Sequence, residues 1–182
     1  MIDEQLSVRP WQVEDFEPII DYFLKSDKDF LFNMRVDISK LPSKDEWLKI
    51  MSSDFNREPE NKDFYYVIWL LDNKAIGHSN INKIIFGQEA YMHLHVWPET
   101  KRKKGMGLTF LKKTLPYYFN IFHLKTLYCE PSALNIAPNK TLEKLGFDFI
   151  KSYDTIPGWI NMFQTVNRWC LSESKFRAMD PD

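Results

Sequence analysis

The 182-residue sequence has few cysteines, almost no net charge and no long apolar run. Two cysteines, Cys129 and Cys170, are too few for a disulfide framework, so we expect buried thiols. A formal net charge of −1 argues against a general nucleic-acid binder, which is usually basic over a whole face. No stretch approaches the ~18 apolar residues of a membrane span, and the opening MIDEQLSV lacks an export signal pattern. We therefore expect a cytoplasmic protein with no nucleic-acid or membrane partner.

The composition and length indicate one domain. A chain that is 44% hydrophobic and 15% aromatic can bury one sizeable core. We find no internal repeat, low-complexity segment or linker, so we expect a single domain over residues 1–182.

Helical and strand-like patterns alternate along the chain. Four segments carry the apolar spacing of amphipathic helices: one led by Phe16, one after a capping box at Ser43 and Glu46, one from Leu108 in which Pro116 should cause a kink or an early end, and one opened by Asn135. Seven segments read as strands: 6–9, 65–71, 75–85, 90–97, 124–130, 147–153 and 159–171. Asp72 and Asn73 predict a tight hairpin turn, and 30–34 reads as an apolar connector, either core or substrate mouth. The pattern predicts an α/β (α+β) fold with one mixed, mostly antiparallel sheet of about seven strands and about four helices.

A cationic, glycine-containing loop links the fourth strand to the third helix. Four consecutive cations, residues 101–104, precede Gly105 and Gly107 at the start of the helix, where positive charge opposes the macrodipole. Glycines let the backbone approach a ligand, so successive N–H groups can point at phosphate oxygens. The stretch therefore fits a pyrophosphate cradle, and equally a solvated turn.

A second motif resolves this ambiguity. Residues 135–147 read NIAPNKTLEKLGF, with an Asn opening a short helix that ends in Lys-Leu-Gly-Phe. Together with Arg102, Gly105 and Gly107, this order resembles the GNAT superfamily of acyl-CoA-dependent N-acyltransferases, and more narrowly its ribosomal-protein N-terminal acetyltransferase-like branch.

The resemblance implies an enzyme that moves an acetyl group from acetyl-CoA to a primary amine, either a protein N-terminal α-amine or a small molecule. It implies that pantetheine pairs with the strand ending at Trp97, that the loop binds pyrophosphate, and that Asn135 contacts the cofactor as well as capping its helix. The cofactor-binding residues expected on this basis are Val96, Trp97, Arg102, Lys103, Lys104, Gly105, Met106, Gly107, Leu108, Thr109, Asn135 and Asn139.

The sequence departs from the family at the general acid. The usual Tyr is replaced by Leu142, and a Ser typical of the branch is replaced by Pro138. A thiol such as that of CoA, with a pKa of ~8.5, does not strictly need an acid to leave at neutral pH. Glu130, which stands where some relatives have a catalytic glutamate, is the candidate base, or an ordinary strand-end carboxylate.

Two polar rows follow strand alternation. His78, Asn80 and Asn82 share one face of their strand, while Tyr91, His93 and His95 share one face of the next. Such rows are costly inside a covered sheet unless they are hydrogen-bonded or face a cavity. They predict either a substrate site, with His93 and His95 catalytic and His78, Asn80 and Tyr91 contacting substrate, or a satisfied structural network.

Two alternative functions fit parts of the sequence. Gly87, His93, His95 and Glu99 nearly reproduce the first metal motif of the cupins, but those proteins are all-β and need a second motif that is missing downstream. We therefore expect no metal. The missing acid also allows an acyl-CoA-binding module without turnover. The sequence leaves open the acceptor amine and the choice between monomer and homodimer.

Overall fold

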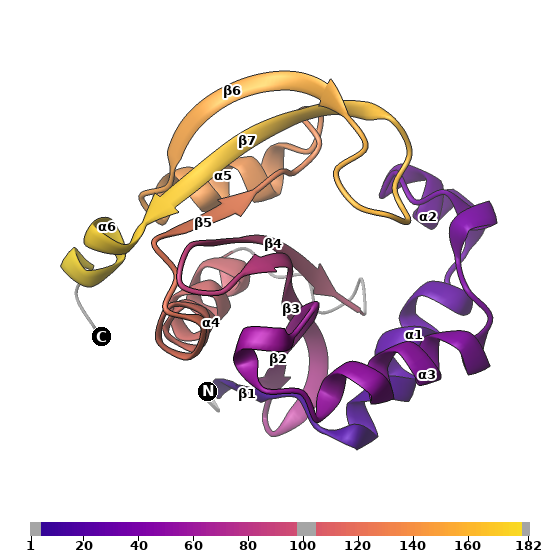
Figure 1. Cartoon of the computed structure of the whole chain (residues 1–182). Coiled ribbons are helices and arrows are strands. Elements are labelled where there is room, and N and C mark those ends of the chain that lie inside the picture. Colours follow the sequence, from indigo (N-terminus) through magenta and orange to yellow (C-terminus); the bar gives the residue numbers. More distant parts are fainter. Residues whose placement is uncertain (1–4, 98–104, 180–182) are drawn as a thin grey trace.

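A seven-stranded mixed sheet forms the centre of the computed structural model, which describes residues 5–97 and 105–179 (Figure 1). The strand order is β1-β2-β3-β4-β5-β7-β6, and only the β4–β5 pair is parallel. The strands are β1 (Leu6–Pro10), β2 (Phe64–Leu71), β3 (Lys74–Ile85), β4 (Glu89–Val96), β5 (Thr126–Cys129), β6 (Asp148–Thr155) and β7 (Gln164–Ser172). In the described residues the helices are α1 (Phe16–Leu24), α2 (Lys28–Asn33), α3 (Lys44–Phe55), α4 (Met106–Phe122), α5 (Ile136–Lys144) and α6 (Glu173–Ala178). The predicted fold class and its seven strands are confirmed.

Local signals set several of these boundaries. Asp72 and Asn73 both adopt left-handed φ angles, 49° and 62°, in the turn between β2 and β3. Two such residues in succession match the twist of the flanking strands. At α3, the Ser43 and Glu46 side chains form the expected capping box.

The two faces of the sheet pack against different helices. On one face, Trp69 stacks on Phe110 of α4 with ring centroids 4.9 Å apart and donates its indole N–H to Thr114 Oγ1 at 3.0 Å. On the other face, Phe23 of α1 lies 5.3 Å from the ring of His95. The sheet is thus covered on both sides, and its polar rows face the N-terminal helices.

Helix α4 is longer than expected. It begins at Met106 rather than at Leu108, and it continues through Pro116 to Phe122, so the expected early end is wrong. Proline forfeits one helical hydrogen bond. The neighbouring Leu115, Tyr118 and Phe119 are almost fully buried, and their packing offsets that loss.

Three further boundaries differ from expectation. The connector at 30–34 is mostly helical, within α2, because the Asp27 carboxylate accepts from the N–H groups of Asp29 and Phe30. Strand β7 begins at Gln164 rather than at residue 159, and residues 156–163 form a loop. Helix α6, capped by the Ser172 hydroxyl, was not expected.

Candidate functional site

Strands β4 and β5 pair over only half the length of β4. Their parallel register ends at Met92 and Cys129, so His93 to Val96 continue without a β5 partner among the described residues. On the other side, β3 pairs with β4 as far as Val96. His93 and Glu130 are the next residues on the two sides of this parting.

The amide of Trp97 donates to the carbonyl of Ile76, 2.8 Å away, and therefore points toward β3. Strand alternation then directs the N–H groups of Leu94 and Val96 to the other side, into the gap left by β5.

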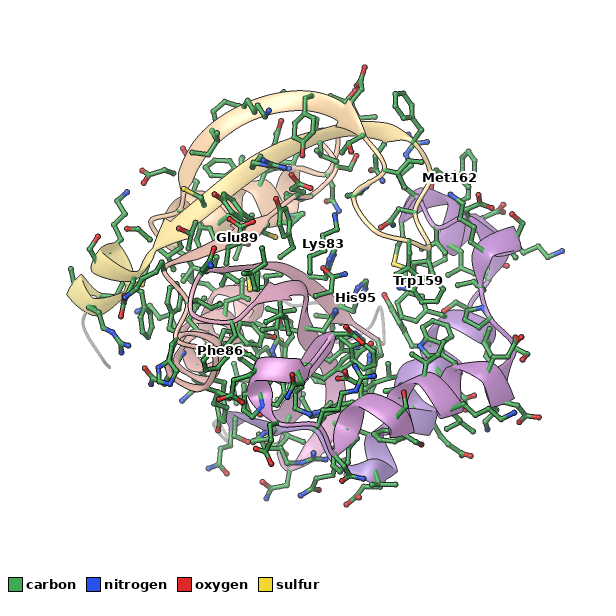
Figure 2. All side chains as sticks on the ribbon, viewed as in Figure 1. Lys83, Phe86, Glu89, His95, Trp159 and Met162 are labelled. Carbon is green, nitrogen blue, oxygen red and sulfur yellow. The ribbon has the colours of Figure 1, made fainter. Side chains whose placement is uncertain are left out.

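A cavity of about 440 Å³ opens against this part of the sheet. Its floor comes from the polar rows of β3 and β4, its walls come from α1, the segment after α2, α3 and β2, and the β6–β7 loop covers it. Figure 2 shows Lys83 and His95 on the sheet and Trp159 on the facing loop. The lining residues are Phe23, Met34, Val36, Trp47, Ile50, Asp63, Phe64, Tyr66, His78, Asn80, Asn82, Lys83, His93, His95, Gly158, Trp159, Ile160 and Asn161. Its size falls within the ~300 to 1,000 Å³ of small-molecule sites.

The β6–β7 loop is fixed to the segment after α2 by main-chain hydrogen bonds. The Asp37 amide donates to the Ile160 carbonyl at 2.7 Å, and the Met162 amide donates to the Arg35 carbonyl at 2.8 Å. A Cβ added at Gly158 would lie 3.9 Å from His93 Cε1, so the loop lies directly above that ring.

Both predicted polar rows contribute to the cavity. His78, Asn80, Asn82, His93 and His95 all line it, as the alternation predicted. His78 Nδ1 accepts from the indole of Trp97 at 2.9 Å, and His93 Nε2 lies 3.3 Å from Asn82 Oδ1. The rows are therefore partly hydrogen-bonded and also face a cavity, and their contact with a substrate stays a prediction.

Tyr91, expected to contact substrate, does not line this cavity. Its ring faces Lys83 Nζ at 4.8 Å and the Arg168 guanidinium at 5.6 Å.

Burial keeps two of the histidines neutral. Burial lowers the pKa of His78 well below its usual value, and the nearby His95 and His93 add to the effect. Burial also lowers the pKa of His93 to about 4, helped by Lys83 and opposed by Glu130. Both imidazoles are therefore uncharged at neutral pH.

Glu130 sits in a polar cluster beside the parting. Its Oε1 accepts from Arg168 Nε at 2.6 Å and from the hydroxyl of Tyr153. Its side chain is only 3% exposed. Burial and the bond to Glu130 raise the pKa of Tyr153 to about 12. Glu130 is not among the described residues that line the cavity. It does act electrostatically on His93, which lines the cavity.

The α5 motif lies on the other side of the gap. Asn135 occupies the N-cap position, but its side chain makes no cap hydrogen bond. Asn139 is engaged: Nδ2 donates to the carbonyls of Ser132 and Asn135, while Oδ1 accepts from the indole of Trp169 at 2.8 Å. Leu142 is fully buried in the core and is no source of protons.

The start of α4, which we expected to bind pyrophosphate, begins at a glycine with a left-handed backbone, and its role in binding stays a prediction. Gly105 has a φ of 92°, and a Cβ at Gly107 would meet no heavy atom of the described structure within 4 Å. The amides of Leu108 and Thr109 both donate to the Gly105 carbonyl. The predicted contacts from Arg102, Lys103 and Lys104 lie outside the described residues.

Sequence reasoning missed the apolar part of the site. Phe23, Trp47 and Trp159 read as core or as strand, yet they line the cavity with Lys83. The only local signal was Pro157-Gly158, which indicated a connection at this point.

The family follows from a comparison of the sequence with family models. Residues 5–148 match the model described as an acetyltransferase (GNAT) domain. The chain belongs to the GNAT acetyltransferase family. No curated protein sequence matches it. The narrower ribosomal-protein branch stays a prediction.

Solved structures agree with this GNAT fold. The spermidine N-acetyltransferase of Vibrio cholerae in complex with CoA and spermine has a TM-score of 0.77 at 17% identity, over 95% of this chain and 98% of that one. A dodecameric structure of the same Vibrio enzyme gives 0.72 at 17% identity, over 94% and 96%. An uncharacterized protein from Bacillus halodurans gives 0.69 at 13% identity, over 97% and 89%.

The GNAT fold rules out the cupin alternative, because the described chain carries six α-helices where a cupin would be all-β. Within the described residues no three metal-ligating side chains gather at one point. None of the described helices is both long and apolar enough to cross a membrane.

Proposed function

We propose that this protein transfers an acetyl group from acetyl-CoA to a primary amine that enters through the cavity. The observation that carries the proposal is the coincidence, within a GNAT fold, of the parted strands β4 and β5 with the cavity floor at His93 and His95. The pantetheine of acetyl-CoA would pair with the edge of β4 beyond Met92, where the register with β5 has ended, and bring the thioester to the gap. Pyrophosphate would bind at the glycine start of α4.

In this proposal the amine nitrogen attacks the thioester carbonyl carbon, and the carbon–sulfur bond breaks. The N–H group of Leu94 points into the gap, where it can stabilise the developing oxyanion. CoA leaves as a thiolate, which needs no acid from position 142. The amide product keeps one hydrogen on nitrogen, and the other proton passes to a base.

Glu130, His93 and His95 are the candidate bases at the parting. Glu130 stands opposite His93 across it, and Tyr153 and Arg168 orient its carboxylate. A base contributes less for a weakly basic amine, because more of that amine is already neutral. At pH 7 an α-amine of pKa ~7.8 is about 14% neutral, whereas a lysine-like amine of pKa ~10.4 is about 0.04% neutral.

The test is a screen of primary amines with the full-length protein and acetyl-CoA. Release of free CoA thiol and the mass of the acetylated amine are both measured. We expect amine-dependent CoA release with one acetyl group transferred per thiol. Binding of acetyl-CoA without amine-dependent release by any acceptor would instead identify a binding module without turnover.

Matched histidine variants locate the acceptor site. His93→Ala and His95→Ala should raise the amine KM or lower kcat and leave acetyl-CoA affinity nearly unchanged. His123→Ala, at an exposed position outside the cavity lining, is the control and should behave as wild type.

A further inference from the structure

Away from the polar rows of its floor, the cavity is lined by apolar and aromatic side chains, whereas a polyamine site would need negative charge. Among its described lining residues only Asp63 and Lys83 carry a formal charge, and their signs cancel. The Asp63 carboxylate is 74% exposed and already ion-paired with Arg57, 2.6 Å away. A chain with several ammonium groups would have to leave water for a lining whose described residues offer almost no compensating charge.

The apolar lining forms a continuous path to the parted strands. The Trp159 ring, 55% exposed at the loop, lies 6.0 Å from the Trp47 ring. Trp47 lies 5.3 Å from Phe23, and Phe23 lies 5.3 Å from His95. Figure 2 shows both ends of this path, Trp159 on the loop and His95 on the sheet. These rings can thus contact a bound aromatic group anywhere between the β6–β7 loop and the edge of β4.

A lysine reinforces the preference for an acceptor without extra positive charge. The φ of Lys83 is 48°, an uncommon conformation for a residue with a side chain, at the irregular end of the β3–β4 pairing. Its Nζ donates to the carbonyl of Pro157 at 3.1 Å, which ties the loop to the sheet. The charge of Lys83 therefore lines the cavity close to His93, whose pKa it helps to lower.

We infer that the acceptor is a primary amine that carries one apolar aromatic group a few bonds from the nitrogen, and that polyamines are excluded. This inference rests on the proposed function and specifies its substrate class. The ring would lie among Phe23, Trp47 and Trp159, and the amine would reach the gap beside His95. The apolar surroundings also favour the neutral form of the amine, which is the nucleophile. The acceptor is either a free arylalkylamine or a peptide whose first residue is aromatic.

Binding and turnover are measured separately. Calorimetry on the protein saturated with CoA compares 2-phenylethylamine with spermidine, and this dead-end complex reports on the cavity without any chemistry. Turnover with acetyl-CoA compares the same two amines, together with two peptides that differ only in a first residue of Phe or Glu. We expect 2-phenylethylamine to bind about tenfold or more tightly than spermidine. Turnover of the Phe peptide above that of 2-phenylethylamine would assign the site to polypeptide N-termini, and the reverse order would assign it to small amines.

Two pairs of variants test the named residues. Trp159→Ala should lower kcat/KM for 2-phenylethylamine roughly tenfold. Phe163→Ala, on the same loop, 69% exposed and outside the lining, should change it less than about twofold. Lys83→Gln keeps a hydrogen-bond donor for the Pro157 carbonyl and should reduce the difference in affinity between 2-phenylethylamine and spermidine. Lys74→Gln, at the other end of β3, should leave that difference unchanged.

The outcomes separate the two proposals. Preferred binding or turnover of spermidine would overturn the aromatic acceptor and leave the acetyltransferase proposal standing. CoA release unaffected by every amine would overturn the acetyltransferase proposal. Calorimetry would then still show which amine the cavity prefers. Equal or tighter binding of spermidine would contradict the inference, and tighter binding of 2-phenylethylamine would support it.

Discussion

Gly77 of β3 is a position at which a substitution would displace the end of β4 beside the cavity. It pairs with Val96 at the end of the β3–β4 register. A Cβ there would lie well inside van der Waals contact of the His95 carbonyl oxygen and 3.1 Å from the Cα of Val96. Both neighbours are backbone atoms, so Gly77→Ala can be accommodated only if the two strands move apart.

Two opposing terms set the effect of Gly77→Ala on the free energy of unfolding. Overpacking costs ~1 to 3 kcal/mol, and the stiffer unfolded chain returns ~0.4 to 1 kcal/mol. We expect the free energy of unfolding to fall by about 1 to 2 kcal/mol, a melting temperature lower by roughly 2 to 8 °C. Thermal and urea unfolding without ligand measure this directly. The affinity for acetyl-CoA should fall as well, because the displaced residues belong to the edge of β4 at which we propose that pantetheine binds.

The control is the same substitution at Gly107, where a Cβ would meet nothing within 4 Å in the described structure. Gly107→Ala should leave the unfolding free energy unchanged or raise it by up to ~1 kcal/mol. A Gly77→Ala protein as stable as wild type would refute the reasoning.

Three further predictions concern the cofactor loop, the base and the buried histidines. Acetyl-CoA at ~100 times its Kd should stabilise the protein by ~2.7 kcal/mol, a melting shift of roughly 5 to 11 °C, and Gly107→Val should abolish the shift with the fold intact. An unchanged shift in differential scanning fluorimetry would contradict a cofactor site there. Glu130→Gln should lower kcat at neutral pH by a factor that shrinks toward pH 9 as the amine loses its own proton, with acetyl-CoA affinity nearly constant. If Glu130→Gln keeps full kcat from pH 6 to 9 while His93→Ala or His95→Ala loses it, the base is one of these histidines. His93 binds its proton only near pH 4 when folded but near 6.5 when unfolded, so the unfolded state gains protons first and stability falls as pH drops from 6.5 to 4. His93→Gln should remove about 1 to 2 kcal/mol of that loss in urea titrations at pH 7 and 5, and an equal loss in both proteins would contradict a buried neutral imidazole.

The parts of the fold that were predictable are those with local causes. The capping box at Ser43, the Asp72-Asn73 turn and the left-handed Gly146 after α5 each depend on residues within one turn. Strand alternation likewise placed His93 and His95 on one face, and that face lines the cavity.

What could not be predicted depends on contacts between distant segments. The loop at 156–163 has strand-like composition, but its main chain bonds to residues 35–37, and the Asn161 side chain reaches the Arg35 carbonyl from 126 positions away. No periodicity records such a pairing. The same holds for Glu130, whose partner Arg168 lies 38 residues away and comes from β7.

The β6–β7 loop has a consequence for how this enzyme family can diversify. The match to the GNAT model ends at residue 148, while Trp159 and the rest of the loop lie beyond it. The loop covers the cavity and is tethered at Arg35, Asp37 and Lys83. Under the proposed function, exchanging residues 156–163 together with the segment after α2 would change the acceptor specificity. The glycine start of α4 and the edge of β4, where we propose that acetyl-CoA binds, would stay unaltered, so new acceptors could evolve without rebuilding that site.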